Sequence, residues 1–173
     1  MVYTGRAQSQ ISNLNTDYFI TLNASYTLTS QTAAQKLFNA SPTGALLLPS
    51  GTYLFECDFN LSALSATSGA FGFALGGTLT SQSWKSIANK AALATAVAPQ
   101  ATANTAANAA ICTATTNTVG WARIVGKFRV SVAGLVVPRV SLGVAAAAVV
   151  GADSYFRARR VADVGDTKIG PWT

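Results

Sequence analysis

The sequence contains no histidine, its one methionine is the first residue, and only 10% of its 173 residues are charged. Without imidazole there can be no Ser-His-Asp triad, no histidine-ligated metal and no histidine switch near neutral pH. Two cysteines fall short of the four ligands of a usual structural zinc site. These absences favour a structural or binding protein, and we expect neither enzymatic activity nor a cofactor.

What the chain does contain is small residues: Ala, Thr, Ser and Gly make up nearly half of it, and 50% of all residues are hydrophobic. This apolar content is too high for a solvated disordered chain. The length predicts a single domain. The 12 basic and 6 acidic residues give a net charge of +6.

No apolar run is long enough to cross a bilayer. The most apolar late run, residues 140–152, is shorter than the about 20 residues that a transmembrane helix needs. The first ten residues lack the apolar core of a signal peptide. We therefore expect no membrane association. We expect the chain to be made and assembled in a cytosol, where Cys57 and Cys112 stay reduced. Cys57 falls on the apolar side of an expected strand, as a small buried hydrophobe.

Alternation of apolar and polar residues is the dominant pattern, and it predicts half-buried β-strands. In residues 52–61 the apolar side chains fall at odd positions, whereas Glu56 and Asp58 point to the other face. Residues 122–132 alternate in the same way. The other expected strands are residues 25–29, 35–39, 45–48, 71–75, 136–144 and 154–161.

Short strands separated by Gly, Pro and Ser turns predict an all-β fold, an antiparallel β-sandwich of jelly-roll type. Residues 1–24 alternate poorly and are expected to form a short N-terminal arm, with the jelly-roll domain over residues 25–173. Pro138 predicts an edge or bulged position in its strand. Residues 91–117 are expected to hold one or two weak strands inside a long loop.

The position of the charges points to self-association. No charged residue lies between Ala91 and Ala122 or between Phe59 and Trp84. A free monomer usually covers its surface with charges of both signs, whereas the cores of interfaces are depleted in charge. We therefore expect an obligate oligomer.

The basic residues near the end of the chain form a candidate interface. They can contact phosphates, or they can pair with Glu56 and Asp58 on neighbouring strands. The sequence has no RNA-binding signature, so we expect no nucleic-acid partner. The basic residues concerned are Arg123, Lys127, Arg129, Arg157, Arg159 and Arg160.

Other motifs carry little chemistry. Glu56 and Asp58 are the one carboxylate pair that could serve a glycosidase, but such pairs are common in sheets. Asp153, Asp163 and Asp166 lack the spacing of an EF-hand, so we expect no metal. The glycine-rich segments lack the lysine of a P-loop.

Aromatic side chains can anchor an interface or fill the core. The candidates are Tyr3, Tyr18, Tyr53, Trp84, Trp121 and Trp172. We expect Trp121 in the core, because it stands at the start of a strand. Trp172 follows Gly170 and Pro171 near the end of the chain and is the better interface candidate.

Three segments, residues 25–39, 44–53 and 151–157, carry a resemblance to a known group. They read SYTLTSQTAAQKLFN, GALLLPSGTY and GADSYFR. Together they resemble tailed-bacteriophage virion proteins with a trimeric jelly roll, similar in architecture to tumour-necrosis-factor and C1q heads. The likeness extends over residues 25–165, and it brings no catalytic residues with it.

The resemblance implies a capsid decoration (cement) protein, a homotrimer that binds the major capsid protein on the outer surface of the virion and stabilises the shell. The alternative is the receptor-binding tip of a tail or head fibre that recognises host glycans. The expected capsid-docking residues are Tyr3, Arg6, Tyr18 and Phe19. The expected interface residues are Trp172, Arg157 and Arg159.

Overall fold

The computed structural model describes residues 16–38, 44–89, 100–104, 108–113 and 118–163, and these form thirteen strands and no helix. The strands are β1 (Asp17–Thr21), β2 (Tyr26–Thr27), β3 (Gln35–Lys36), β4 (Leu46–Leu48), β5 (Gly51–Ser62), β6 (Phe71–Gly77), β7 (Ser81–Asn89), β8 (Gln100–Asn104), β9 (Asn108–Cys112), β10 (Gly120–Val130), β11 (Gly134–Leu142), β12 (Val149–Val150) and β13 (Tyr155–Ala162). The expected all-β class is confirmed.

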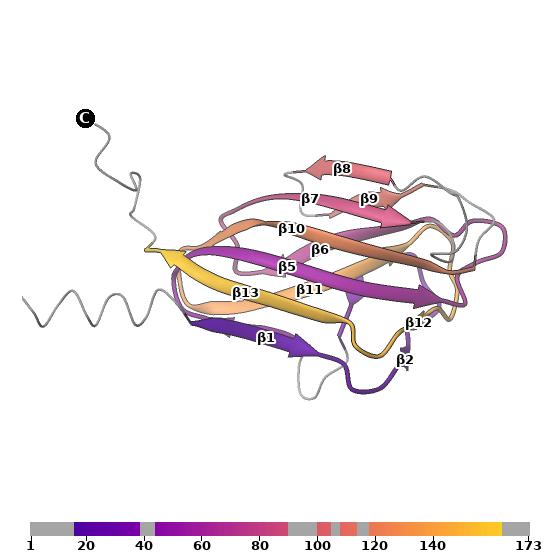
Figure 1. The fold of residues 1–173 in the computed structure, drawn as a ribbon, viewed down its shortest axis with the longest axis horizontal. Helices are drawn as coiled ribbons and strands as arrows, with labels where there is room; N and C mark the ends of the chain where they lie inside the picture. The colour runs from indigo at the N-terminus through magenta and orange to yellow at the C-terminus, as the bar shows by residue number, and fades with distance from the viewer. Residues whose placement is uncertain (1–15, 39–43, 90–99, 105–107, 114–117, 164–173) are drawn as a thin grey trace, which may run out of the picture.

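Two antiparallel sheets form a sandwich (Figure 1). The large sheet has the order β1-β13-β5-β10-β7-β8, with the short strands β2 and β12 at its side, and the small sheet has the order β3-β11-β6-β9, with β4 beside β11. Along the chain, β4, β6, β9 and β11 of the small sheet alternate with β5, β7, β10 and β13 of the large one. This repeated crossing between sheets is the connectivity of a jelly roll.

Alternation along the strands builds the core between the sheets. In β5 the residues at odd positions, from Tyr53 to Leu61, are buried, and the even positions face outward. Phe55 lies at the centre of an aromatic cluster, with ring centroids 5.6 Å from Phe156, 5.7 Å from Phe128 and 6.3 Å from Phe73. Burial of such rings is the main favourable contribution to the folding of this sandwich.

Gly126 leaves the space that this cluster needs. It pairs with Phe55 on one side and Trp84 on the other, in the middle of β10. A Cβ atom at this position would lie 2.4 Å from the Ser83 carbonyl oxygen and 2.7 Å from Cε1 of Phe55. No larger residue fits there without displacing backbone.

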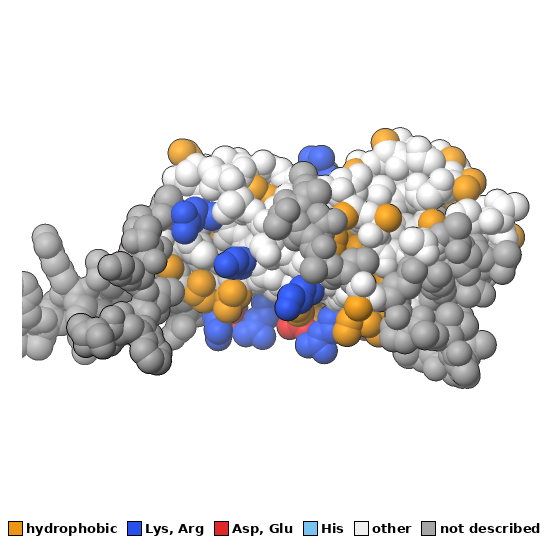
Figure 2. All heavy atoms as spheres, turned by 90° about the horizontal axis from the view of Figure 1, so that it is seen from above, with side chains coloured by type: hydrophobic (Ala, Val, Ile, Leu, Met, Phe, Trp, Pro, Cys, Tyr) orange, Lys and Arg blue, Asp and Glu red, His pale blue; other side chains and the backbone are white. Residues whose placement is uncertain are grey.

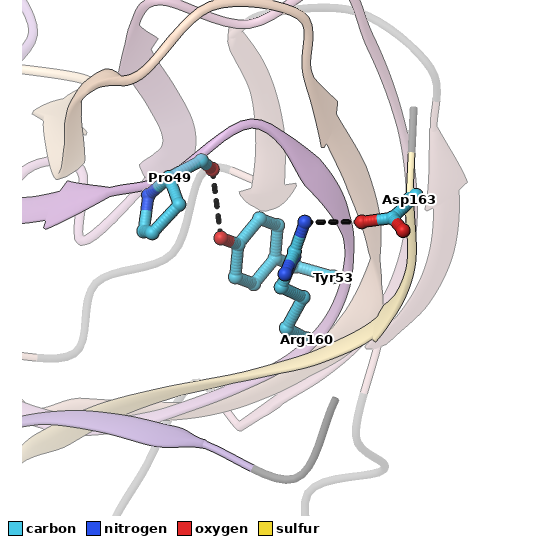
Figure 3. Close-up of polar contacts among 4 residues, drawn as sticks. All are labelled: Pro49, Tyr53, Arg160 and Asp163. Carbon is cyan, nitrogen blue, oxygen red and sulfur yellow. Dashed lines mark hydrogen bonds and ion pairs between the residues drawn. The ribbon is translucent and has the colours of Figure 1, made fainter. Parts of the chain in front are cut away.

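Tyr53 on β5 and Arg160 on β13 lie opposite each other, close to the start of β5 (Figure 3). The Tyr53 hydroxyl donates a hydrogen bond of 2.7 Å to the Pro49 carbonyl oxygen, and Arg160 forms an ion pair with Asp163. Burial raises the pKa of Tyr53 to about 12, with a further contribution from Tyr18 and an opposing one from Arg160. The register shift after Arg160 breaks the alternation of β13 at this end.

Three expectations about the elements need correction. Residues 17–21, placed in the arm, form the edge strand β1, which pairs with β13. Strand β7 was not expected at all, because only small or polar residues accompany Trp84 on its inward side. Pro138 lies inside its sheet and not at a bulge or at the sheet's outer edge: β11 pairs with β6 on one side, and on the other side Pro138 falls in a gap between the segments that β4 and β3 cover, so the strand is open there only locally.

Two aromatic residues that stood as interface candidates belong to the core. Tyr53 is fully buried and stacks on Phe128 at 5.2 Å, and Trp84 is buried edge-on against Phe73 at 5.5 Å. Conversely, Trp121 was expected in the core but is only half-buried. It stands opposite Asn60 and two residues before Arg123, so it shares their side of the sheet.

Candidate docking face

The side of the large sheet that faces away from the core, here called the outer face, carries the most distinctive surface of the described chain. Its side chains form rows that run across the strands. One row contains Phe19, Arg157, Glu56, Val125 and Lys85, in the order β1, β13, β5, β10 and β7. The next row contains Asp17, Arg159, Leu54, Lys127 and Ser83.

Large apolar side chains are exposed on this face. Phe19 is 55% exposed, Ile87 49%, and Leu54 and Val125 are each 45% exposed. They occupy positions where the alternation of a half-buried strand calls for a polar residue. Single exposed apolar residues are ordinary, but several on one sheet face make that face a candidate docking surface.

Positive charge predominates among the ionisable residues of the outer face. The cationic side chains are Lys85, Arg123, Lys127, Arg129, Arg157 and Arg159, and the carboxylates are Asp17, Glu56 and Asp58. Half of the chain's 12 basic residues therefore share one face. In Figure 2, which shows the molecule from above, most of the visible Lys and Arg side chains gather along the lower border beside carboxylates and apolar groups.

Two of the carboxylates form ion pairs with this positive charge. Arg157 Nη2 lies 2.8 Å from Asp17 Oδ2, and this hydrogen bond raises the pKa of Arg157. Arg123 pairs with Glu56. Burial raises the pKa of the neighbouring Tyr155, and Glu56 raises it further. None of the ion pairs found among the described residues involves Lys85, Lys127 or Arg159.

Asp58 sits in an environment that disfavours its charged form. Partial burial raises the pKa of Asp58, the charge on Glu56 raises it further, and Arg123 opposes both effects. Asp58 lies directly opposite Arg123 on β10 and Tyr155 on β13. The carboxylate pair noted in the sequence is thus held among strand neighbours as part of a surface network.

A shallow groove crosses the outer face. Its volume is about 570 Å³, and it lies over β13, β5, β10 and β7. Leu54, Val125 and the backbone at Gly126 contribute to its lining. The charged residues that line it are Glu56, Lys85, Lys127, Arg157 and Arg159. The groove therefore combines apolar surface with an excess of cations.

The structure brings three of the expected site residues together. Phe19 on β1 lies directly opposite Arg157 on β13, and its ring stacks on Tyr155 at 5.5 Å; Arg159 is two residues further along β13. Tyr18 packs instead against Tyr53, with ring centroids 6.1 Å apart. Tyr3, Arg6 and Trp172 lie outside the described residues.

Four residues of this face were not predicted from the sequence: Leu54, Lys85, Ile87 and Val125. A signal for two of them was present. Leu54 and Val125 are apolar residues at outward positions of otherwise alternating strands, and such exceptions mark exposed apolar surface. Lys85 and Ile87 lie on β7, the strand that was not expected.

Comparison with known proteins adds fold-level likeness only. No protein-family model and no curated protein matches the sequence. Among solved structures, the chain is similar to Eiger, a tumour-necrosis-factor protein of S. frugiperda, with 13% identity, a TM-score of 0.41, and coverage of 90% of this chain and 98% of that one. At such similarity the likeness carries no information about activity or partners.

Two further structures are more distant. The CBM22-1 and GH10 modules of Clostridium thermocellum endo-1,4-β-D-xylanase 10B, complexed with xylohexaose, match 91% of this chain and 29% of their own, with 9% identity and a TM-score of 0.31. The sugar-binding C-terminal domain of EclA matches 84% of this chain and 74% of its own, with 13% identity and a TM-score of 0.26.

Other types of site find little support in the part of the chain that the structure describes. No group of three or more Cys, Asp or Glu side chains there is arranged to hold a metal ion. No helix within the described ranges has the length and apolarity to cross a membrane. Docking of another molecule is the use that the outer face fits best.

Proposed function

We propose that this chain is a non-enzymatic docking module of a bacteriophage particle, a decoration protein that binds the outer capsid surface through its outer face and stabilises the shell. The observation that carries the proposal is the group of exposed apolar residues, Phe19, Leu54, Ile87 and Val125, beside Lys85, Lys127 and Arg159, which are in none of the ion pairs of the described residues. The resemblance of residues 25–165 to phage virion proteins supports the location.

Binding of this kind stabilises a shell by burying apolar surface across the junctions of neighbouring capsid subunits. Each bound copy adds contacts that must break before the shell opens, so the apparent stability of the shell increases. Many evenly distributed copies then oppose the pressure of packaged DNA. No bond is made or broken in this role, so it needs no catalytic group.

The proposed active form is a homotrimer. The long charge-free stretches of the sequence support close approach between copies, since interface cores are depleted in charge. In the described residues β1 and β8 are the outermost strands of the large sheet's main path, and edge strands need a cover. A mass measurement on the purified chain tests this part directly: three times 17.8 kDa is expected.

The experiment for the proposed function compares complete particles with particles that lack this protein. Particles without it should release DNA at lower temperature, and addition of the purified chain should restore their resistance. Equal heat resistance of the two kinds of particle would refute the role in shell stability. Restoration by the chain separates a loss of docking from a defect in assembly.

A second candidate is the receptor-binding tip of a fibre that recognises host glycans. The half-buried Trp121 on the outer face favours it, because aromatic faces commonly pack against apolar surfaces of ligands. Binding to a glycan array that is lost in Trp121→Ala and retained in Leu54→Thr would support this candidate. The location of the protein, at the tail or over the shell, separates the two functions.

A further inference from the structure

We infer that the groove on the outer face holds an extended acidic segment of a partner protein, in which two carboxylates flank an apolar side chain. The inference rests on the proposed docking function and specifies its chemistry. The groove is lined by four cations, Lys85, Lys127, Arg157 and Arg159, against the single carboxylate of Glu56. A ligand that complements this lining carries negative charge.

Two groups of cations lie at opposite sides of the groove. Arg157 and Arg159 stand two residues apart on β13, while Lys127 is on β10 and Lys85 on β7. Neighbouring strands are about 4.8 Å apart, so β13 and β7, which are three strand steps apart, are separated by about 14 Å. An extended peptide advances about 3.4 Å per residue, so carboxylates four residues apart span this distance.

Along the diagonal from Arg159 to Lys85, the surface between the cations is apolar. Leu54 and Val125 lie on β5 and β10, between the arginines and Lys85, and both are 45% exposed. A peptide that crosses the strands therefore places its central residue over these two side chains. Burial of this apolar surface contributes roughly 25 cal/mol for each Å² removed from water.

The same features argue against a uniformly charged polyanion. Glu56 lies between Arg157 and Val125 in its row, and Asp58 is two residues away on the same strand. A nucleic acid or sulfated polysaccharide would bring negative charge close to both carboxylates, which costs free energy. The proposed peptide carries charge only at the two sides of the groove, and its uncharged central residue lies over the middle.

Three of the cations can bind a carboxylate of the ligand without first breaking an ion pair of the described residues. Arg159, Lys127 and Lys85 are in none of the ion pairs of the described residues, whereas Arg157 is already paired with Asp17. An arginine has five N–H donors in a planar fork and can bind a second carboxylate beside the first. Charge-assisted hydrogen bonds of this kind are about twice as strong as neutral ones.

The test uses two fluorescent peptides and the full chain. The probe GDTLTDG carries aspartates four residues apart around a leucine, and the control GNTLTNG replaces both with asparagine. The variant combines Lys127→Glu and Arg159→Glu. Its matched control combines Lys36→Glu and Arg139→Glu, which make the same change of charge on the small sheet, where these two residues lie opposite each other.

The wild-type chain should bind the acidic probe at least about tenfold more tightly than the neutral control, and the groove variant should lose this preference. The small-sheet variant should keep the preference within about twofold, and added salt should weaken binding. Equal binding of both peptides, or an equal loss in both variants, would overturn the inference. Circular dichroism shows that each variant is folded.

Other occupants appear as distinct results. Tighter binding of a heparin oligosaccharide or an oligonucleotide than of the acidic peptide would overturn the inference in favour of a polyanion. A change in the oligomeric mass of the groove variant would assign the groove to contact between copies of the chain. If the peptide fails to bind but the chain still docks on particles, the inference falls and the proposed function stands.

Discussion

Leu54 on β5 lies directly opposite Arg159 on β13, a cation without an ion pair among the described residues, and almost half of the leucine is exposed to solvent. An exposed leucine adds nothing to a core. On the strand on its other side, Lys127 stands opposite it, so this apolar side chain lies between two positive charges. The arrangement fits a partner surface with apolar and acidic groups in the same order, and it gives the first prediction.

The double substitution Leu54→Thr and Val125→Thr should weaken docking without unfolding the protein. Threonine has the β-branched shape that strands favour, and both positions are 45% exposed. We therefore expect the free energy of unfolding in urea to change by no more than about 0.5 kcal/mol for each site. Binding to particles, measured by co-sedimentation, should fall clearly.

The matched control is Leu47→Thr on the small sheet, where the leucine is 68% exposed. This substitution removes exposed apolar surface from a different face. It should leave co-sedimentation unchanged. If Leu47→Thr reduces docking as much as the double substitution, the outer face is not the docking surface.

The packing around Gly126 gives a prediction about stability. Gly126→Ala places a Cβ atom 2.4 Å from the Ser83 carbonyl oxygen and 2.6 Å from Cβ of Trp84, so β7 and β10 must move apart. The expected loss in the free energy of unfolding is about 1–3 kcal/mol, as for other overpacked cores. Chemical denaturation measures it.

Gly151→Ala is the comparison for this effect. The nearest atom to a Cβ there is Cβ of Asn60 at 3.3 Å, and the next lies at 3.8 Å. The loss should be smaller, within about 0.5 kcal/mol. Equal losses at Gly126 and Gly151 would show that the contact with Ser83 and Trp84 is relieved without cost.

Asp58 gives a pH dependence of stability with a definite sign. Its pKa in the folded state is raised, first by burial, so the folded state binds the proton more tightly than the unfolded chain does. The stability linked to neutral Asp58 is present at low pH and is lost as pH rises from the ordinary carboxyl pKa through the raised one. Asp58→Asn should therefore stabilise the protein above this window and not below it.

Urea denaturation of both proteins over a pH series checks this. Arg123 lowers the pKa of Asp58, so Arg123→Gln should extend the window to higher pH. The opposite sign, with Asp58→Asn destabilising only at the higher pH, would mean that the attraction to Arg123 outweighs burial.

The thiol of Cys57 should be inert in the folded protein. Cys57 is fully buried, and burial raises its pKa, with further contributions from Asp58 and Glu56. Since the thiolate is the reactive form, a thiol reagent at mildly alkaline pH should modify Cys57 only as fast as the protein unfolds. In a Cys112→Ala background, rapid modification without denaturant would contradict the burial of Cys57.

Much of the sandwich was predictable because period-2 alternation is strong where one face is a large apolar core. The strands around residues 52–61 and 122–132 show this, since every inward residue except Gly126 is apolar. β7 was not predicted from the sequence, because Ser86 and Ala88 occupy inward positions there. Small inward residues remove the contrast on which the pattern depends.

The site was predictable only in part, because it is assembled by pairing between distant strands. Arg157 and Arg159 stood out as basic residues on one strand side, and Phe19 as an aromatic near the start of the chain. Their contact depends on the antiparallel pairing of β1 with β13, about 140 residues apart. Local patterns do not report such pairing, and β1 was therefore assigned to an arm.

The most direct test of the proposed function is an image of the complete particle with this chain labelled. The account predicts many evenly spaced copies over the outer surface of the shell, each in contact with the capsid through the face that bears Leu54 and Arg159. Few copies confined to the tail, or none on the particle, would contradict it.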